Sequence, residues 1–272
     1  MAAMISSTVD SSTFRAEKRR DYDDAVRRTK RLGTALAVIS ILVLWHFLAL
    51  YNRPWVPSIA DTLRSMQAAL SGAQFYSDML ITWRRLLLAF LTATLVGVSI
   101  GVVVGFNKKA EAFCAPLIAL ALAVPDPVYI IFANLAIGTG ELAGYIALVL
   151  AIVPFVINVV RTSVQARDVQ LDEMSKIYHI PAGRHFQHVI VPQLVPSLLT
   201  AARFSFALSW KIVILVEALT QPEGIGARIY NYFHMLRMRD AIACAILFCV
   251  LMQLAEKVIF LPAEKRLMRW KS

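Results

Sequence analysis

Residues 86–106 read LLLAFLTATLVGVSIGVVVGF and contain no charged side chain. A helix needs about 20 mostly apolar residues to cross the hydrocarbon core of a bilayer, so this segment is long enough to span one. Gly97, Gly101 and Gly105 recur every four residues within it. Because this spacing places small residues on one helix face, the pattern predicts close packing against a neighbouring helix. The segment therefore predicts an all-α membrane protein.

Similar apolar segments precede and follow this one. We expect about six transmembrane helices, at about 32–51, 86–106, 112–138, 142–160, 194–219 and 241–261. Pro125, Asp126 and Pro127 interrupt the third of these, where each proline removes a backbone hydrogen-bond donor. Residues 1–31 are polar and charged, so we expect a cytoplasmic tail there and a transmembrane domain over 32–272.

The composition argues against a soluble protein. Hydrophobic residues make up 58% of the chain and charged residues 17%, whereas soluble domains have about 45–50% and about 25%. The net charge of +10 does not indicate nucleic-acid binding, because the basic residues lie between the apolar segments and not in one patch.

Six spans place both termini on one side. With that side inside the cell, most of the 28 Lys and Arg residues fall in inner segments, as the positive-inside rule requires.

Catalytic and metal-binding motifs are absent from the sequence. Cys114, Cys244 and Cys249 all lie in apolar stretches and lack metal-ligand spacing. The five histidines provide neither a nucleophile–base pair nor a ligand cluster, which disfavours a membrane-embedded enzyme. No Gly-rich loop ending in Gly-Lys-Ser or Gly-Lys-Thr occurs, so we expect the chain to bind no ATP, metal or other cofactor.

The most informative polar stretch is LDEMSKIYHIPAG, residues 171–183. Its apolar side chains recur at helical spacing, at Leu171, Met174, Ile177 and Tyr178. A short amphipathic helix in a polar loop presents an apolar face where no membrane surrounds it. Such a face is typical of a helix that docks in the groove of a partner protein.

Residues 171–202 resemble the cytoplasmic coupling loop of binding-protein-dependent ABC permeases. That family has Glu, two small residues, three variable residues and Gly, followed thirteen residues later by Pro. This chain has Glu173, Met174, Ser175, His179 and Pro192 at those positions. The family's pattern of Phe, Val, Pro and Pro is matched by Phe186, Val189, Pro192 and Pro196. Since His179 replaces a Gly that adopts a left-handed turn at low cost, we expect the loop to turn through 181–183 instead.

The resemblance covers about residues 83–270, and the branch is similar to the nitrate, sulfonate and taurine importers. Its motif residues here are Thr82, Arg85, Pro125, Pro127, Ala202, Arg203, Trp210, Glu217, Gly224, Ile225 and Gly226. The resemblance implies that 32–272 is the permease domain of a type I importer in a bacterial inner membrane. It also implies a homodimer of permeases, an extracytoplasmic solute-binding protein, and cytoplasmic ATPase subunits that bind ATP and Mg.

A coupling loop of about 168–192 is implied by the same resemblance. The residues expected to contact the ATPase are Asp172, Glu173, Met174, Ser175, Ile177, Tyr178, His179, Ile180, Pro181, Ala182 and Gly183.

Four ionisable residues within the expected spans are candidates for the translocation pathway: Asp126, Arg203, Lys211 and Glu217. A charge at the centre of a bilayer costs about 2.5–3.5 kcal/mol on insertion scales, so such residues face water or a protein partner. Two interpretations remain open, namely lining of the pathway and structural pairing or helix capping. The two cations on the fifth span suit an anionic solute. An ATP-independent carrier or channel is the alternative, but it predicts ionisable residues on several spans.

Overall fold

The computed structural model describes residues 28–29, 32–52 and 55–267. The expected polar tail, 1–31, therefore lies outside the described residues except for Arg28 and Thr29, which are helical. The chain divides into two compact units, Met1–Asp61 and Thr62–Ser272. Each unit is described by itself.

The first unit contains the helix Leu32–Tyr51, which is long and apolar enough to cross a membrane. Its bounds agree with the first expected span. Nearly all of its apolar side chains are exposed, as suits a helix whose solvent is lipid. From this helix, the Trp45 indole Nε1 donates a hydrogen bond to the Pro57 carbonyl oxygen at 3.0 Å. Helix α2 (Ile59–Ser71) follows, and the Ser58 hydroxyl caps it by accepting from the Asp61 backbone N–H.

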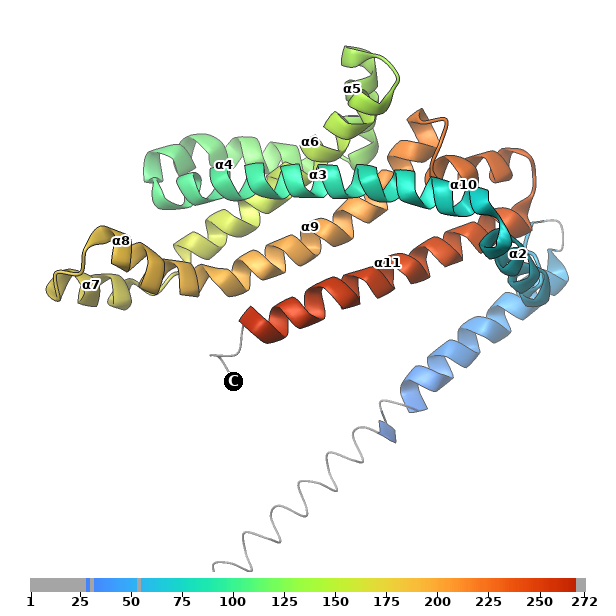
Figure 1. Cartoon of the computed structure of the whole chain (residues 1–272), viewed down its shortest axis with the longest axis horizontal. Helices are drawn as coiled ribbons and strands as arrows, with labels where there is room; N and C mark the ends of the chain where they lie inside the picture. Colours follow the sequence, from blue (N-terminus) through green and yellow to red (C-terminus); the bar gives the residue numbers. More distant parts are fainter. Residues whose placement is uncertain (1–27, 30–31, 53–54, 268–272) are drawn as a thin grey trace, which may run out of the picture. The chain divides into compact units, whose positions relative to one another are not determined.

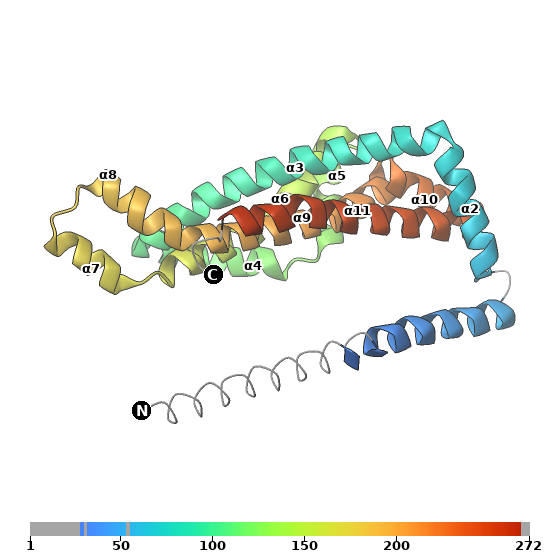
Figure 2. The same ribbon diagram turned by 60° about the horizontal axis from the view of Figure 1, so that its bottom comes forward.

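The second unit is a bundle of four long helices, α3 (Ala73–Phe106), α6 (Glu141–Gln165), α9 (Val191–Thr220) and α11 (Met238–Leu267). They run side by side in both views (Figure 1, Figure 2). Helix α6 packs against α3 and α9, and α9 also packs against α11. The apolar window of α6 is 44% buried, more than that of any other candidate span in the described residues, so α6 forms the centre of the bundle.

The glycine stripe of α3 packs directly against α6. A Cβ added at Gly97, Gly101 or Gly105 would lie 2.6–2.7 Å from the Cβ of a valine on α6. The three valines follow one another at the same four-residue spacing: Val156, Val160 and Val164. Real Cβ atoms do not approach so closely, so the two helices can adopt this separation only with glycine at these positions. The predicted packing role of the stripe is confirmed.

Helix α3 begins at Ala73, thirteen residues before the expected start of the second span at residue 86. Its 34 residues give a length of about 50 Å, well beyond the ~30 Å of a hydrocarbon core. The early residues stay helical because Phe75, Met79 and Thr82 are buried along one face of α3. Polar side chains in this part of α3 also find partners within the protein.

The expected third span is not one straight helix. Helices α4 (Lys108–Ala123) and α5 (Asp126–Ile137) occupy it and are bent by 98° at the break between them. Pro125 lies in the break and Pro127 in the first turn of α5, where they remove backbone donors and disfavour a continuous helix. The Tyr129 hydroxyl donates to the Ala121 carbonyl oxygen across the break at 2.7 Å. The described residues thus contain five single helices able to span a membrane, or six with this bent pair.

The connections gather at the two ends of the bundle. Helices α7 (Val169–Ile177) and α8 (Ala182–His185) and the π-helix Phe186–Ile190 lie at one end, and α10 (Ile225–His234) lies at the other (Figure 1). No break separates α8 from α9, so an apolar helix runs without interruption from Gly183 to Thr220. The loop expected at about 168–192 and the loop that follows α9 are therefore at opposite ends.

Candidate functional site

Helix α7 presents an apolar face that the described residues of the second unit leave exposed. The side chains of Ile177 and Tyr178 are 75% and 73% exposed, and Met174 is also exposed on the same helix. Ser175 is buried against the chain on the other face. The predicted amphipathic helix is therefore present, with its apolar side turned outwards at the end of the bundle.

The turn after α7 is centred on His179, which has a φ of +50°. The Ile180 backbone N–H donates to the Ser175 carbonyl oxygen at 3.0 Å, which is the six-to-one bond that closes a helix around a left-handed residue. The expectation of a turn through 181–183 is wrong, because Gly183 lies inside α8. Histidine tolerates the left-handed region better than most residues, so the cost at this position is modest.

Ion pairs and hydrogen bonds hold α7 to the ends of the long helices. Arg167, just after α6, donates from Nε to Asp172 Oδ2 at 2.9 Å, and His185 Nε2 lies 3.3 Å from Asp172 Oδ1. The Asp168 backbone N–H donates to Gln193 Oε1 of α9 at 2.8 Å. The Asp172 carboxylate thus lies within ion-pair distance of Arg167 and His185 of the same loop, whereas its neighbours Leu171 and Glu173 are exposed.

The other expected coupling residues are on the outside of this end. Glu173, Ile180, Pro181 and Gly183 are exposed, and Ala182 begins α8. A partner protein can therefore reach both the apolar face of α7 and the turn that follows it.

Glu217 of α9 is completely buried at the opposite end of the bundle and is bonded on both carboxylate oxygens. Its Oε2 accepts from the Thr82 hydroxyl at 2.9 Å and from the Gly226 backbone N–H at 3.0 Å. Its Oε1 accepts from Arg85 Nη1 at 3.0 Å. The carboxylate therefore joins α3, α9 and α10 through charge-assisted hydrogen bonds.

The loop before α10 closes directly over this carboxylate. Gly224 has a φ of +113°, and a Cβ there would overlap the Glu217 carboxylate. A Cβ at Gly226 would overlap the backbone oxygen of Ile214. Arg228 of α10 adds a second attachment, an ion pair with Asp78 of α3. Only glycine fits at position 224 before α10 and at position 226 in its first turn, which explains the Gly-Ile-Gly pattern.

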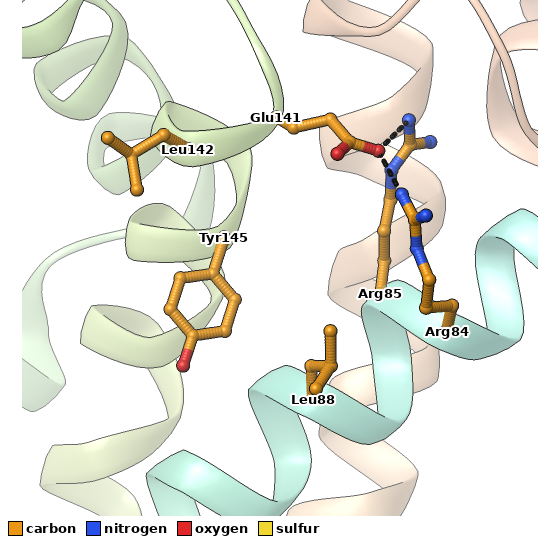
Figure 3. A pocket seen from close by; sticks show the side chains of 6 residues that line it. All are labelled: Arg84, Arg85, Leu88, Glu141, Leu142 and Tyr145. Carbon is orange, nitrogen blue, oxygen red and sulfur yellow. Dashed lines mark hydrogen bonds and ion pairs between the residues drawn. The ribbon is translucent and has the colours of Figure 1, made fainter.

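A cavity of about 590 Å³ lies beside this cluster, between α3 and α6 (Figure 3). Its lining residues are Arg84, Arg85, Leu88, Glu141, Leu142 and Tyr145. Glu141 Oε1 accepts from Arg84 Nη2 at 2.5 Å and from Arg85 Nη2 at 3.2 Å, so one carboxylate oxygen serves two guanidinium groups. Figure 3 shows both arginines reaching from α3 towards Glu141 at the start of α6.

Arg203 and Lys211 lie on the same helix, α9, in different environments. Arg203 donates from Nε to Glu256 Oε1 at 2.9 Å and from Nη1 to Glu264 Oε1 at 3.0 Å, which ties α9 to α11. Lys211 is exposed, and its ammonium lies 5.7 Å from the centre of the Trp210 ring. In the described part of the chain, Lys211 has no carboxylate within ion-pair distance. Asp126, the remaining candidate, is the exposed first residue of α5.

Sequence reasoning missed the partners of these charges. Arg85 and Thr82 were noted only as family motif residues, and Glu141, Glu256 and Glu264 were not singled out. A usable signal existed, since Thr82 and Arg85 are three residues apart and share one helix face. Within residues 28–29, 32–52 and 55–267, no three His, Cys, Asp or Glu side chains group closely enough to hold a metal ion.

Two curated relatives align with most of this chain. One, from Bacillus subtilis (strain 168), carries the name of an aliphatic sulfonates transport permease protein, SsuC; it is 22% identical over 85% of each chain. The nitrate import permease protein NrtB of Synechocystis sp. is 22% identical over 97% of this chain and all of its own length. A crystal structure of inward-facing conformations of the MetNI methionine ABC transporter contains a chain with the same fold. It is 17% identical, with a TM-score of 0.55 over 70% of this chain and 97% of the other.

The helical fold, the membrane spans and the relatives all agree with a sequence profile that covers more than half of the chain. Residues 93–259 match the family described as the binding-protein-dependent transport system inner membrane component. The chain belongs to this family of transport permeases.

Proposed function

We propose that this permease subunit carries a small anionic solute across the inner membrane, driven by a separate ATPase that docks on α7. The names of the two relatives, which refer to aliphatic sulfonates and to nitrate, support an anion. The absence of a phosphate-binding loop from the sequence supports ATP and Mg binding on the partner. The remaining partners in this proposal are an extracytoplasmic solute-binding protein and a second copy of this chain.

The exposed apolar face of α7 is the observation that carries the proposal. Ile177 and Tyr178 would remain in water unless a partner covered them, because this helix lies outside the apolar spans. Apolar side chains of a short helix that insert into a groove are a recurring mode of protein recognition. We therefore assign the ATPase contact to Met174, Ile177, Tyr178 and the exposed Glu173 beside them.

The attachments of α7 give the coupling a physical route. Arg167 links Asp172 to the end of α6, and Gln193 links the start of α7 to α9. A displacement of α7 by the ATPase would thus act on α6 and α9 together. Helix α6 is the central helix of the bundle, and α9 carries Lys211. In our proposal their movement switches the pathway between inward-facing and outward-facing states.

Lys211 is the pathway residue that the geometry favours most among the four candidates. It lies nine residues before the end of α9, or about 13 Å along the helix, within a helix apolar enough to cross a membrane. An ionisable group at this depth is costly unless it faces water or a counter-charge. Arg203 and Glu217 have such counter-charges within the chain. We propose that Lys211 instead faces the water-filled path and attracts the anion.

The coupling assignment is tested by co-purification from membranes. Tagged permease carrying Glu173→Lys should retain much less ATPase than the unmodified protein. Glu223→Lys is the matched control, because it makes the same charge change at an exposed position two residues before α10. Helix α10 lies at the opposite end of the bundle from α7 (Figure 1). Equal retention by both variants would refute docking on α7. Uptake that continues without the ATPase would instead indicate the alternative, an ATP-independent carrier.

The pathway assignment is tested by uptake in cells or vesicles. Lys211→Gln should lower the uptake of the anion while the ATPase still co-purifies, and Lys211→Arg should restore most of the uptake because the positive charge returns. Equal uptake by Lys211→Gln and the unmodified protein would remove Lys211 from the pathway.

A further inference from the structure

The cavity between α3 and α6 is built like a ligand site, although it is small for a passage through the bundle. Its volume of about 590 Å³ falls within the ~300–1,000 Å³ typical of small-molecule pockets. Two guanidinium groups stand at its polar end, and the side chains of Leu88, Leu142 and Tyr145 form its apolar wall (Figure 3). The cavity thus combines a cationic end with an apolar surface.

The arginine donors exceed the acceptors that the cavity offers. Arg85 uses Nη1 for Glu217 and for the Glu223 carbonyl oxygen, and Nη2 for Glu141, but its buried Nε finds no acceptor among the described residues. Arg84 is 58% exposed, and within the described residues its guanidinium contacts only the same Glu141 oxygen. A guanidinium has five N–H donors in a planar fork. Unused donors therefore remain on both arginines.

Glu141 is positioned as a counter-ion that a ligand can replace. Its side chain is 58% exposed, and one of its oxygens serves both arginines. Exposed ion pairs of this kind contribute little to stability, so the carboxylate can move aside at small cost. By contrast, the second anchor of Arg85, Glu217, is completely buried, so Arg85 stays in place when Glu141 moves. An incoming oxyanion would find the arginines already positioned.

We propose that this cavity binds an amphiphilic oxyanion, with its charged head on Arg84 and Arg85 and its apolar chain against Leu88, Leu142 and Tyr145. Planar guanidinium groups suit the oxygens of a sulfonate or phosphate head. The head takes the place of the Glu141 carboxylate. The location, at the end of the bundle opposite α7, is the outer mouth of the permease. This last statement rests on the proposed function, which puts α7 at the cytoplasmic side.

Equilibrium dialysis of full-length permease, purified in detergent without added ATPase, against labelled butanesulfonate tests the site. Arg84→Gln should weaken binding about tenfold, because a charge-assisted hydrogen bond is lost. Arg84→Lys should weaken binding less. Glu141→Gln should strengthen binding about threefold, because the competing carboxylate is neutralised. Arg239→Gln is the control, since it removes an exposed positive charge from the first turn of α11, outside the cavity lining.

Native mass spectrometry of the same variants distinguishes the two sources of such a ligand. If butanesulfonate fails to bind but Arg84→Gln loses retained phosphatidylglycerol, the site exists and its ligand is an anionic lipid. The proposal is overturned if Arg84→Gln and Glu141→Gln bind both butanesulfonate and phosphatidylglycerol as strongly as Arg239→Gln does. Because no ATPase takes part, failure here leaves the docking assignment of α7 to its own test.

Discussion

The two ends of the bundle are stabilised in opposite ways. At the α10 end, a fully buried carboxylate, Glu217, has a partner on each oxygen, and Arg228 pairs with Asp78 beside it. At the α7 end, apolar side chains such as Ile177 and Tyr178 are in the open. At the α10 end the buried carboxylate of Glu217 is paired within one chain, whereas the α7 end leaves apolar side chains exposed. Substitutions at the first end should therefore change stability, and substitutions at the second should change association.

The largest effect is expected for Glu217→Ala. Removing one partner of a buried pair leaves Arg85 without its anchor and costs about 3–5 kcal/mol. Thermal unfolding of the purified permease in detergent should show a large drop in midpoint. Glu173→Ala, an exposed carboxylate on α7, is the control and should change stability by less than about 0.5 kcal/mol. Similar midpoints for the two variants would show that the buried carboxylate is not what holds α3, α9 and α10 together.

An intermediate effect is expected for Gly224→Ala. The substitution places a Cβ against the Glu217 carboxylate at a φ of +113°, where side chains are strained, so we expect a loss of about 1–3 kcal/mol. Gly183→Ala is the matched control at the other end, because a Cβ there meets nothing within 4 Å and the residue is helical. The control should be neutral or slightly stabilising. If both substitutions destabilise equally, the tight closure of the α10 loop over Glu217 is wrong.

Local patterns in the sequence predicted the features that depend on one helix and its nearest neighbour. The length of the apolar run at 86–106 predicted a span, and the glycine spacing predicted the contact that α3 makes with α6. The periodicity of residues 171–178 likewise predicted α7. Each of these features follows from side chains that lie within a few turns of one another, so spacing alone carries the information.

Features that depend on distant partners could not be predicted in this way. Thr82 and Glu217 are 135 residues apart, and no spacing rule indicates that they meet. For the same reason, the sequence could not separate Arg203, which is paired with α11, from Lys211, which has no carboxylate partner in the described residues. The apolar run at 86–106 could not show that α3 begins at Ala73, because Arg84 and Arg85 precede that run. Their partners on α6, α9 and the loop before α10 keep them within the helix.

The smallest effect on stability, and the largest on association, is expected for Tyr178→Ala. The ring is 73% exposed, so its loss should change the unfolding midpoint little, by less than about 0.5 kcal/mol. Buried aromatic anchors of an interface often contribute 2 kcal/mol or more, which corresponds to a loss of about 30-fold in affinity for the ATPase. Quantitative co-purification at several ATPase concentrations measures this loss. Normal binding with a lowered midpoint would reverse the comparison, because Tyr178 would then stabilise its own chain and the partner would contact another surface.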